Sequence, residues 1–209
     1  MTQMRSPVGA PGAGESIEGG DVETVVDVAL EVGSKRTFAT ALAWPGWCRS
    51  GKGEIAAIDA LLDYAPRYDR VLARARLSLP DVLRLAVVER LAGGAGTDFG
   101  APGAPADAES RATSHQDGER LAAILAACWQ AFDEIAGGAP EELRKGPRGG
   151  GRDLSKIVEH VLEAERGYYA RRLGVRRPPF APDDRAALEA LRAAVLDVLR
   201  RPSDGLPLV

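Results

Sequence analysis

Lys156-Ile-Val-Glu-His160-Val-Leu-Glu-Ala-Glu165 is the segment that identifies the second half of this 209-residue chain as helical. Its apolar side chains recur every three or four residues, which places them on one face of an α-helix. The same spacing extends over residues 154–168, with Asp153 as the expected N-cap and an end expected near Leu173. At about 100° per residue, His160 lies beside this apolar face, at the edge of the predicted core.

Two further amphipathic helices are expected, one on either side of this helix in the sequence. The first has its apolar stripe between residues 121 and 135 and stops at a pair of glycines. The second is capped by Asp183 or Asp184 and has its stripe between residues 188 and 199. Three such helices with short to medium connections predict a helical bundle over residues 119–209.

The N-terminal part of the chain has the patterns of a sheet. Apolar and polar side chains alternate from Val22 to Glu31 and again from Phe38 to Trp44, which predicts a β-hairpin. The period then becomes helical from Ile55 to Leu72, and Pro66 within this stretch predicts a kink or two short helices. A third strand is expected from Val82 to Leu91. Residues 21–91 therefore predict a small ββαβ sheet-and-helix unit, and the whole chain is predicted to be α+β.

Two segments have compositions that do not favour regular structure. Residues 1–20 are rich in Gly, Pro, Ser and Ala, and we expect a disordered leader there. Residues 92–118 have a similar composition and predict a linker, or a loop lying over the seam between the two halves. A lid or binding loop is the alternative for this second segment, since long loops in compact proteins are often functional.

The overall composition excludes several classes of protein. A net charge of −3 and a pI near 5.5 argue against nonspecific electrostatic binding of nucleic acid, so no nucleic-acid partner is expected. No apolar run reaches the roughly 18 residues that suggest a membrane span, and a cytoplasmic protein without a membrane partner is expected. Cys48 and Cys128 lie too far apart in the sequence to suggest a disulfide framework or a zinc knuckle.

The first half resembles a known family. The hairpin ending in Trp44-Pro45-Gly46-Trp47, followed by a small-residue loop and an Ala-rich helix starting near Glu54, resembles the HicB-like fold. The resemblance covers residues 22–91. In that family a strand ends in a Pro-Gly turn and runs through a short loop into a helix. Its members include antitoxins that occlude a small toxin and adaptor-like domains, so the resemblance implies a small protein partner.

The second half resembles another family. The string Ile157–Glu165, preceded by a helix with Trp129 near its middle, resembles the second helix of the DinB-like and mycothiol-dependent enzyme superfamily. Active members are four-helix bundles that bind a divalent metal through one histidine on that helix and two more, four residues apart, on the fourth helix. The resemblance carries over a single ligand, His160, and implies zinc or nickel as the metal.

The rest of that metal site is missing from the sequence. Two imidazoles at positions i and i+4 would share a helix face and converge on one ion. His115 is the only other histidine of the chain, and it falls in the predicted loop. After the predicted helix over residues 185–201 the chain runs to Val209 without a fourth helix. We therefore expect an incomplete antiparallel bundle, whose exposed apolar face favours a homodimer.

Other candidate groups carry weaker signals. Residues 146–152 are Gly-rich and precede a helix, so they are interpreted as a flexible connection, with anion binding as the alternative. Cys48 would be reactive if its pKa were lowered. Glu159, Glu163 and Glu165 are interpreted as solvated charges on the helix surface. Trp44 and Trp47 are interpreted as packing residues.

The sequence thus leads to two functional hypotheses. The first is an uncharacterised member of the DinB-like superfamily that binds a divalent metal at His160, without a complete catalytic set in this chain. Whether it is an enzyme is left open, because no Ser-His-Asp set can be proposed. The alternative is a non-enzymatic interaction module of the antitoxin-like or adaptor type, which uses the edge of the sheet or the exposed face of the bundle.

Overall fold

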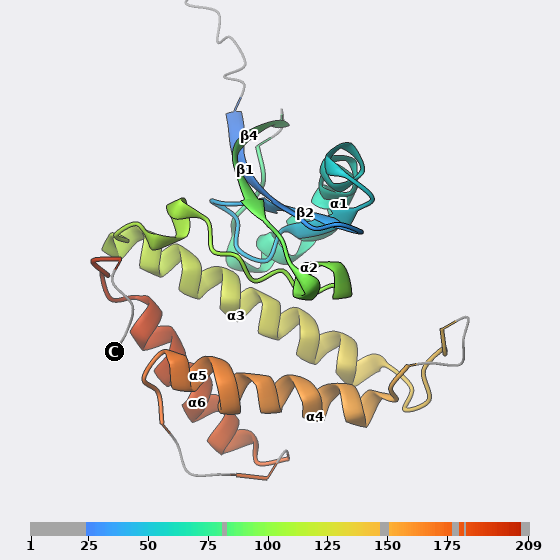
Figure 1. The fold of residues 1–209 in the computed structure, drawn as a ribbon. Helices are drawn as coiled ribbons and strands as arrows, with labels where there is room; N and C mark the ends of the chain where they lie inside the picture. The colour runs from blue at the N-terminus through green and yellow to red at the C-terminus, as the bar shows by residue number, and fades with distance from the viewer. Residues whose placement is uncertain (1–23, 81–82, 147–150, 177–179, 182, 206–209) are drawn as a thin grey trace, which may run out of the picture.

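The computed structural model of the protein describes residues 24–80, 83–146, 151–176, 180–181 and 183–205, and Figure 1 labels its elements. The fold is α+β, as predicted: a four-stranded mixed sheet and its helix are followed by a helical half. The leader predicted for residues 1–20 lies outside the described residues, and so do residues 147–150 of the Gly-rich segment.

The sheet has the strand order β3-β2-β1-β4. Strands β1 (Thr24–Val32) and β2 (Thr37–Ala41) form the predicted hairpin, and β4 (Leu83–Ala92) lies parallel to β1 on its other side. Strand β3 (Cys48–Gly51) pairs antiparallel with β2, so the small-residue loop expected after the hairpin contains a strand. The sequence Cys-Arg-Ser-Gly has no apolar alternation, and its pairing with β2 is what makes it a strand.

Helix α1 (Glu54–Leu72) packs on the sheet and is followed by one 3-10 turn, η1 (Ala73–Ala75). Of the two outcomes predicted at Pro66, the division into two short helices is wrong, because α1 continues through this residue, and a kink stays a prediction. Proline lacks the N–H that would bond to the carbonyl of Leu62, and both residues are exposed, so this missing bond falls on the solvent side of the helix. Buried residues on the opposite side of the helix hold it in place by packing.

The core of the sheet half follows the predicted alternation of β1. Val26, Val28 and Leu30 are buried against α1, where they pack with Leu61. Trp47 is completely buried, its indole N–H donates to the carbonyl of Leu61 at 2.9 Å, and its ring stacks on Tyr68 with 5.8 Å between centroids. The interpretation of Trp47 as a packing residue is therefore confirmed.

The segment between β4 and the helical half is tied to the sheet. It contains helix α2 (Ala95–Phe99) and the 3-10 turn η2 (Asp107–Ser110). Glu31 is buried in β1, and its carboxylate accepts hydrogen bonds from the Thr97 hydroxyl at 2.5 Å and from the N–H groups of Gly103 and Ala104 at 2.9 Å. The Gly/Pro-rich composition therefore belongs to a loop that is fixed over the sheet by a buried carboxylate.

A second carboxylate that ties this segment to the sheet half, Asp98 of α2, makes stability sensitive to acid. It accepts hydrogen bonds from the hydroxyl of Ser34 at 2.5 Å and from the N–H of Lys35 at 2.7 Å, and these lower the pKa of Asp98. A carboxyl group with a lowered pKa in the folded state stabilises the fold above its unfolded pKa of about 3.9, and this contribution is lost as the pH falls through the lower, folded pKa.

We therefore expect Asp98→Asn to flatten the acid side of the stability curve. In thermal unfolding between pH 6 and pH 2, the difference in Tm between wild type and variant should shrink as the pH falls below about 4. Asp59→Asn, at an exposed position of α1, is the control. A Tm difference that stays constant across this range would show that Asp98 does not couple the loop to the turn after β1.

The helical half begins with α3 (His115–Gly138), which is followed by a continuous helical stretch and by α6 (Arg185–Leu199). The middle stretch consists of α4 (Leu154–Ala164), the π-helical turn η3 (Glu165–Tyr169) and α5 (Ala170–Arg172). Of the predicted caps, Asp153 precedes α4 and Asp184 precedes α6. The side chain of Asp184 accepts a hydrogen bond from the N–H of Ala187 at 3.0 Å.

The directions of these helices differ in part from the predicted antiparallel bundle. α3 is antiparallel to α6, since His115 at its start contacts Arg200 just beyond the end of α6. The helical stretch that begins with α4 runs in the same direction as α6. Leu162 of this stretch and Leu188 of α6 line one hollow, and the residues 11 positions later in each, Leu173 and Leu199, line another. In Figure 1 the end of α5 and the start of α6 lie at opposite ends of the helical half.

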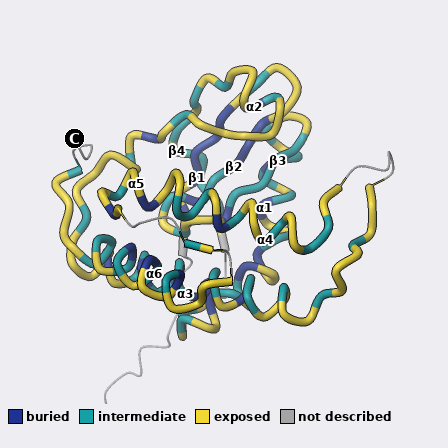
Figure 2. The backbone as a smooth tube through the Cα atoms, turned by 90° about the horizontal axis from the view of Figure 1, so that it is seen from below, coloured by how far each residue is buried: buried dark blue, intermediate teal, exposed yellow. Residues whose placement is uncertain are grey.

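α3 belongs to both hydrophobic clusters of the protein. Ile124 is buried in the sheet cluster, with Cys128 packed against it, whereas Leu125 and Trp129 pack in the cluster of the helical half. Ile135, which the sequence places on the same stripe, is 65% exposed. Buried residues line the strands and the inner sides of the helices, while the connections are mainly exposed (Figure 2).

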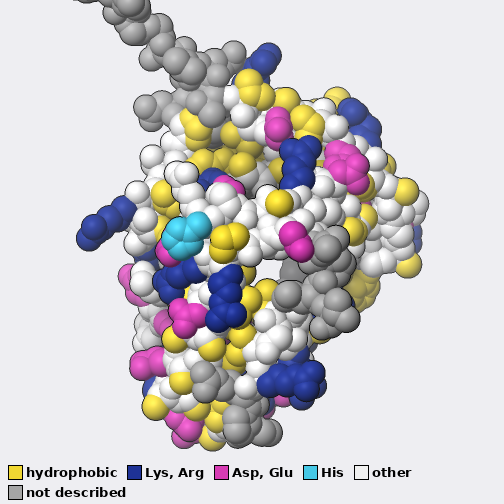
Figure 3. Space-filling model, turned by 90° about the vertical axis from the view of Figure 1, so that its left-hand side faces the viewer, with side chains coloured by type: hydrophobic (Ala, Val, Ile, Leu, Met, Phe, Trp, Pro, Cys, Tyr) yellow, Lys and Arg dark blue, Asp and Glu magenta, His cyan; other side chains and the backbone are white. Residues whose placement is uncertain are grey.

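The surface mixes charges of both signs. On the face shown in Figure 3, basic and acidic side chains alternate among the described residues and form no continuous basic area. No helix within the described ranges is long and apolar enough to cross a membrane.

Candidate functional site

The inner faces of α3, η3, α5 and α6 line an apolar cavity of about 330 Å³ that is partly open to solvent. α3 and α6 bring large side chains at helical spacing, and Ala170 on α5 is small and buried, which leaves space between the helices. Only Glu165 and Arg192 among the described lining residues are charged, and the others are apolar or aromatic. The full set is Leu125, Trp129, Glu165, Tyr169, Ala170, Leu173, Leu191, Arg192, Val195 and Leu199.

Arg192 forms the polar end of this cavity together with two carboxylates. Its Nη1 donates to Oδ2 of Asp133 at 2.7 Å, and its Nε and Nη2 donate to the two oxygens of Glu165 at 3.3 Å each. The guanidinium also lies 4.9 Å from the centroid of the Trp129 ring, which is a cation–π distance. The Arg192 and Glu165 side chains are only 12% and 13% exposed.

These contacts keep Arg192 charged inside the bundle. Burial acts to lower the pKa of Arg192, but the hydrogen bonds to Asp133 and Glu165 outweigh it and the pKa is raised above its ordinary value. Two carboxylates share one guanidinium, so the cluster has a formal charge of −1. A buried pair of this kind is weak evidence for stability, because its attraction is offset by the cost of desolvating the charges.

Glu165 corrects one interpretation of the sequence. The sequence pattern predicts that Glu159, Glu163 and Glu165 are solvated charges on the helix surface. Glu159 and Glu163 are indeed exposed. Glu165 instead starts the π-helical turn η3, which also contains Gly167 and Tyr169. The wider turn brings both Glu165 and Tyr169 to the cavity. π-Helical turns within α-helices are frequent at functional sites.

The ionic cluster separates the cavity from a second hollow of about 320 Å³. Asp133 lines this second hollow, whereas its partner Arg192 lines the first. Phe132, Leu162 and Leu188 form its apolar wall. The helical half therefore has two loosely filled regions, one on each side of this ionic cluster.

His160 does not lie in either region. It is an exposed residue of α4 and is not among the described residues that line them. Among the described residues, no group of three or more His, Cys, Asp or Glu side chains is arranged to hold a metal ion. The described residues therefore do not fit a zinc or nickel site around His160, and metal binding there stays a prediction.

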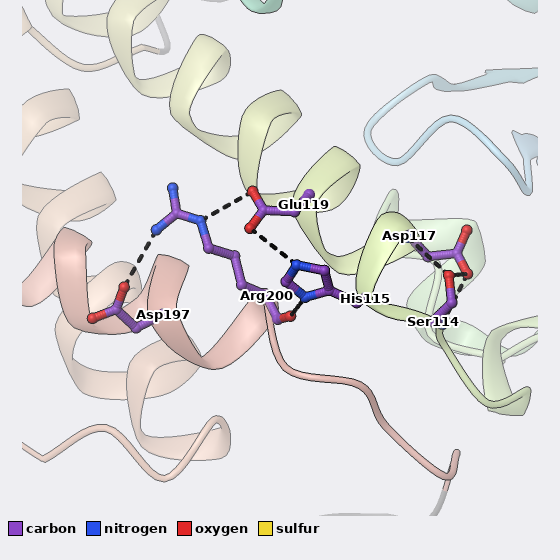
Figure 4. Close-up of polar contacts among 6 residues, drawn as sticks. All are labelled: Ser114, His115, Asp117, Glu119, Asp197 and Arg200. Atoms are coloured by element: carbon purple, nitrogen blue, oxygen red, sulfur yellow. Dashed lines mark hydrogen bonds and ion pairs between the residues drawn. The ribbon is translucent and has the colours of Figure 1, made fainter.

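His115 lies at the start of α3 and not in a loop as predicted. The helix begins here because the Ser114 hydroxyl accepts from the N–H of Asp117 at 3.2 Å and the Asp117 carboxylate accepts from the N–H of Ser114 at 2.9 Å. This reciprocal pair is a capping box, which the sequence Ser-x-x-Asp already contains. Figure 4 shows both residues beside His115.

The His115 side chain joins the start of α3 to the end of α6. Its Nδ1 lies 3.0 Å from the carbonyl oxygen of Arg200, and Nε2 lies 3.9 Å from Glu119. Arg200 in turn pairs with Glu119 and Asp197 at 3.3 Å each (Figure 4). The groups are exposed on the surface and line no described cavity, so we interpret the cluster as a connection between helices.

Cys48 has the environment of an unreactive thiol. It lies in β3, and the Thr40 hydroxyl is 3.1 Å from its sulfur. Burial raises the pKa of the Cys48 thiol above its ordinary value, and the hydrogen bond from Thr40 and the charge of Arg49 only partly oppose this effect. A raised pKa keeps the thiol protonated at neutral pH, so the structure does not support a reactive cysteine.

The edges of the sheet offer little for an added strand. β3 has four residues, and β4 contains a bulge at Val88, since Val28 pairs with Val87 while Ala29 pairs with Glu89. Short strands, bulges and charged side chains are features that protect edges from pairing with another chain. A small protein partner and a homodimer through the helical face stay predictions, and light scattering of the purified protein measures the second.

Comparison with known proteins adds nothing to this geometry: no protein-family model matches the chain, and no curated protein or solved structure is significantly similar to it. The candidate site therefore rests on the cavity itself. The sequence already suggested Trp129 as an aromatic near the middle of its helix, but Arg192 carried no signal, because its two partners come from other helices.

Proposed function

We propose that the helical half of this protein binds a small, mainly apolar molecule in the cavity between α3, α5 and α6. The observation that supports the proposal is a cavity of about 330 Å³ with apolar walls and one charged end. Small-molecule sites in proteins are typically concave, lined mainly by apolar side chains, and provided with a few polar groups that fix orientation.

The polar end has hydrogen-bonding capacity left for a ligand. A guanidinium has five N–H donors, and the contacts of Arg192 within the described part of the chain use three of them. A ligand with a polar group at one end would either accept from the remaining donors of Arg192 or donate to a free lone pair of the Glu165 carboxylate. The aromatic face of Trp129 and the aliphatic side chains of Leu191 and Val195 would contact its apolar body.

We propose binding and not catalysis as the role of this site. The polar groups at the cavity, Arg192 and Glu165, are paired with each other. The described lining residues include no Cys, Ser, Thr or His side chain, and the carboxylate there, that of Glu165, is already held by Arg192. The DinB-like metal site remains an expectation of the resemblance, and the geometry around His160 gives it no added support.

Calorimetric titration with indole tests this function. Indole is mainly apolar and fits a cavity of this size, and its N–H would donate a hydrogen bond to the carboxylate of Glu165. We expect a Kd of roughly 1 mM or tighter, which corresponds to about 4 kcal/mol or more of binding free energy. Filling the cavity by Val195→Trp should weaken binding at least tenfold.

The matched control is Val88→Trp, which places the same side chain at an exposed position on β4. It should bind indole as the wild type does. Val195→Phe provides a smaller filling residue if tryptophan disturbs folding, and the thermal transition of each variant reports whether it is folded. Unchanged affinity in a folded Val195 variant, or no heat of binding by the wild type, would overturn the proposal.

A further inference from the structure

A pocket with a different chemistry lies at the end of α5. It has a volume of about 370 Å³, and its described lining consists of Arg166, Arg171, Val175 and Arg176. None of these residues lines the apolar cavity. Three guanidinium groups around one hollow form a concentration of positive charge in a chain whose net charge is −3.

The backbone around this pocket is held by specific contacts. Gly174 has a φ of +72°, a left-handed conformation that glycine favours, and it reverses the chain at the end of the helix. The N–H of Val175 then donates to the carbonyl of Ala170 at 2.8 Å, and the Val175 side chain is buried. Arg176 is thereby positioned next to the helix that carries Arg171.

Arg166 is fixed from the other side. Its Nη1 donates to the carbonyl oxygen of Phe180 at 2.8 Å, and its guanidinium lies 5.8 Å from the centre of the Phe180 ring. This contact uses one donor of the guanidinium and adds no negative charge. Arg166 therefore keeps both its full charge and several donors for the pocket.

The ordinary explanation for such arginines is the helix dipole, which favours cations near a helix C-terminus. It accounts for Arg171, which lies in the last turn, and less well for the other two. Arg166 lies more than one turn earlier, and Arg176 lies beyond the helix. Within the described residues, no carboxylate forms an ion pair with any of the three.

Like charges gathered around one hollow repel one another unless an anion lies between them. We propose that the pocket of Arg166, Arg171 and Arg176 binds a phosphate group, as inorganic phosphate or as a phosphomonoester. The planar guanidinium fork matches the oxygens of phosphate and forms paired, charge-assisted hydrogen bonds with them. Four oxygens occupy about the volume of four water molecules, ~120 Å³, so the pocket also has space for part of an attached group.

Calorimetric titration of the full chain with sodium phosphate, in a low-salt buffer free of other multivalent anions, tests this site. The double variant Arg171→Gln/Arg176→Gln should bind phosphate at least tenfold more weakly than the wild type. Both side chains are exposed, so the variant should keep the wild-type thermal transition. The charge-matched control is Arg70→Gln/Arg201→Gln, which removes two exposed arginines elsewhere and should leave the affinity unchanged.

Two further arms identify the source of the phosphate. Ribose 5-phosphate represents a soluble monoester, and vesicles with phosphatidic acid in phosphatidylcholine represent a lipid headgroup. If the wild type binds one of these two probes and the pocket variant does not, the proposal is supported and that probe identifies the source of the phosphate. Equal weakening by the two double variants would show a general charge effect and overturn the site, as would a wild type that binds none of the three probes.

Discussion

Replacing Arg192 by methionine is expected to lower the free energy of unfolding by about 3 kcal/mol, to be measured by urea denaturation at pH 7. The substitution leaves the carboxylates of Glu165 and Asp133 without the cation that both of them bind. Removing one partner of a buried ion pair typically costs about 3–5 kcal/mol, and the lower end applies because Asp133 keeps contact with water. Arg201→Met, at an exposed position, is the control.

A triple variant distinguishes the stability lost through unpaired buried charge from the stability lost through poorer packing. When Arg192→Met is combined with Glu165→Leu and Asp133→Leu, most of the lost stability should return, because apolar side chains that replace a buried ionic cluster are often neutral or stabilising. A loss below about 1 kcal/mol in the single variant would contradict this account, since losses of that size are typical of solvent-exposed ion pairs.

Replacing Trp47 by alanine is expected to lower the free energy of unfolding by about 3–5 kcal/mol, the range for a large aromatic residue removed from a core. The substitution removes the stacking on Tyr68 and leaves the carbonyl of Leu61 without its indole donor. Trp44→Ala is the natural comparison, because Trp44 is only partly buried and packs at the edge of the same cluster.

The measurement is urea denaturation followed by circular dichroism, which does not depend on the number of tryptophans. Trp44→Ala should cost clearly less than Trp47→Ala. If the two substitutions cost the same, Trp47 would not be the central packing residue of the sheet half, and its assignment from burial and stacking would be wrong.

Local patterns predicted much of the fold. Val26, Val28 and Leu30 alternate along β1, and this period alone identified the face that α1 covers. The N-terminal ends of α4 and α6 were also predictable, because Asp153 and Asp184 directly precede segments whose apolar residues have helical spacing. These features depend on residues that are close together in the sequence.

The errors arose where distant residues determine the structure. Residues 48–51 form strand β3 because they pair with β2. These four residues have no alternation of apolar and polar side chains that would predict a strand. Pro66 does not divide α1 into two helices, since the packing of α1 on the sheet outweighs one missing backbone hydrogen bond. The parallel course of α4 and α6 depends on the route of the connection between them, which local periodicity does not specify.

The candidate site was the least predictable part of the protein. Glu165 follows directly after an amphipathic helix, and a regular α-helical period assigns it to the surface group of Glu159 and Glu163. The π-helical turn changes that period and brings Glu165 to Arg192, 27 positions later in the chain. A cavity is also a property of how three helices pack, so the sequence of any one of them does not reveal it.

The methyl ¹³C–¹H NMR spectrum recorded during an indole titration locates the bound molecule within the protein. If the cavity of the helical half is the binding site, the methyl signals of Leu125, Leu191 and Val195 shift together and follow a single Kd, while those of Val26 and Leu30 in the sheet core stay in place. Shifts confined to the sheet half, or unchanged signals from all three cavity residues at saturating indole, would contradict the assignment of this cavity as a ligand site.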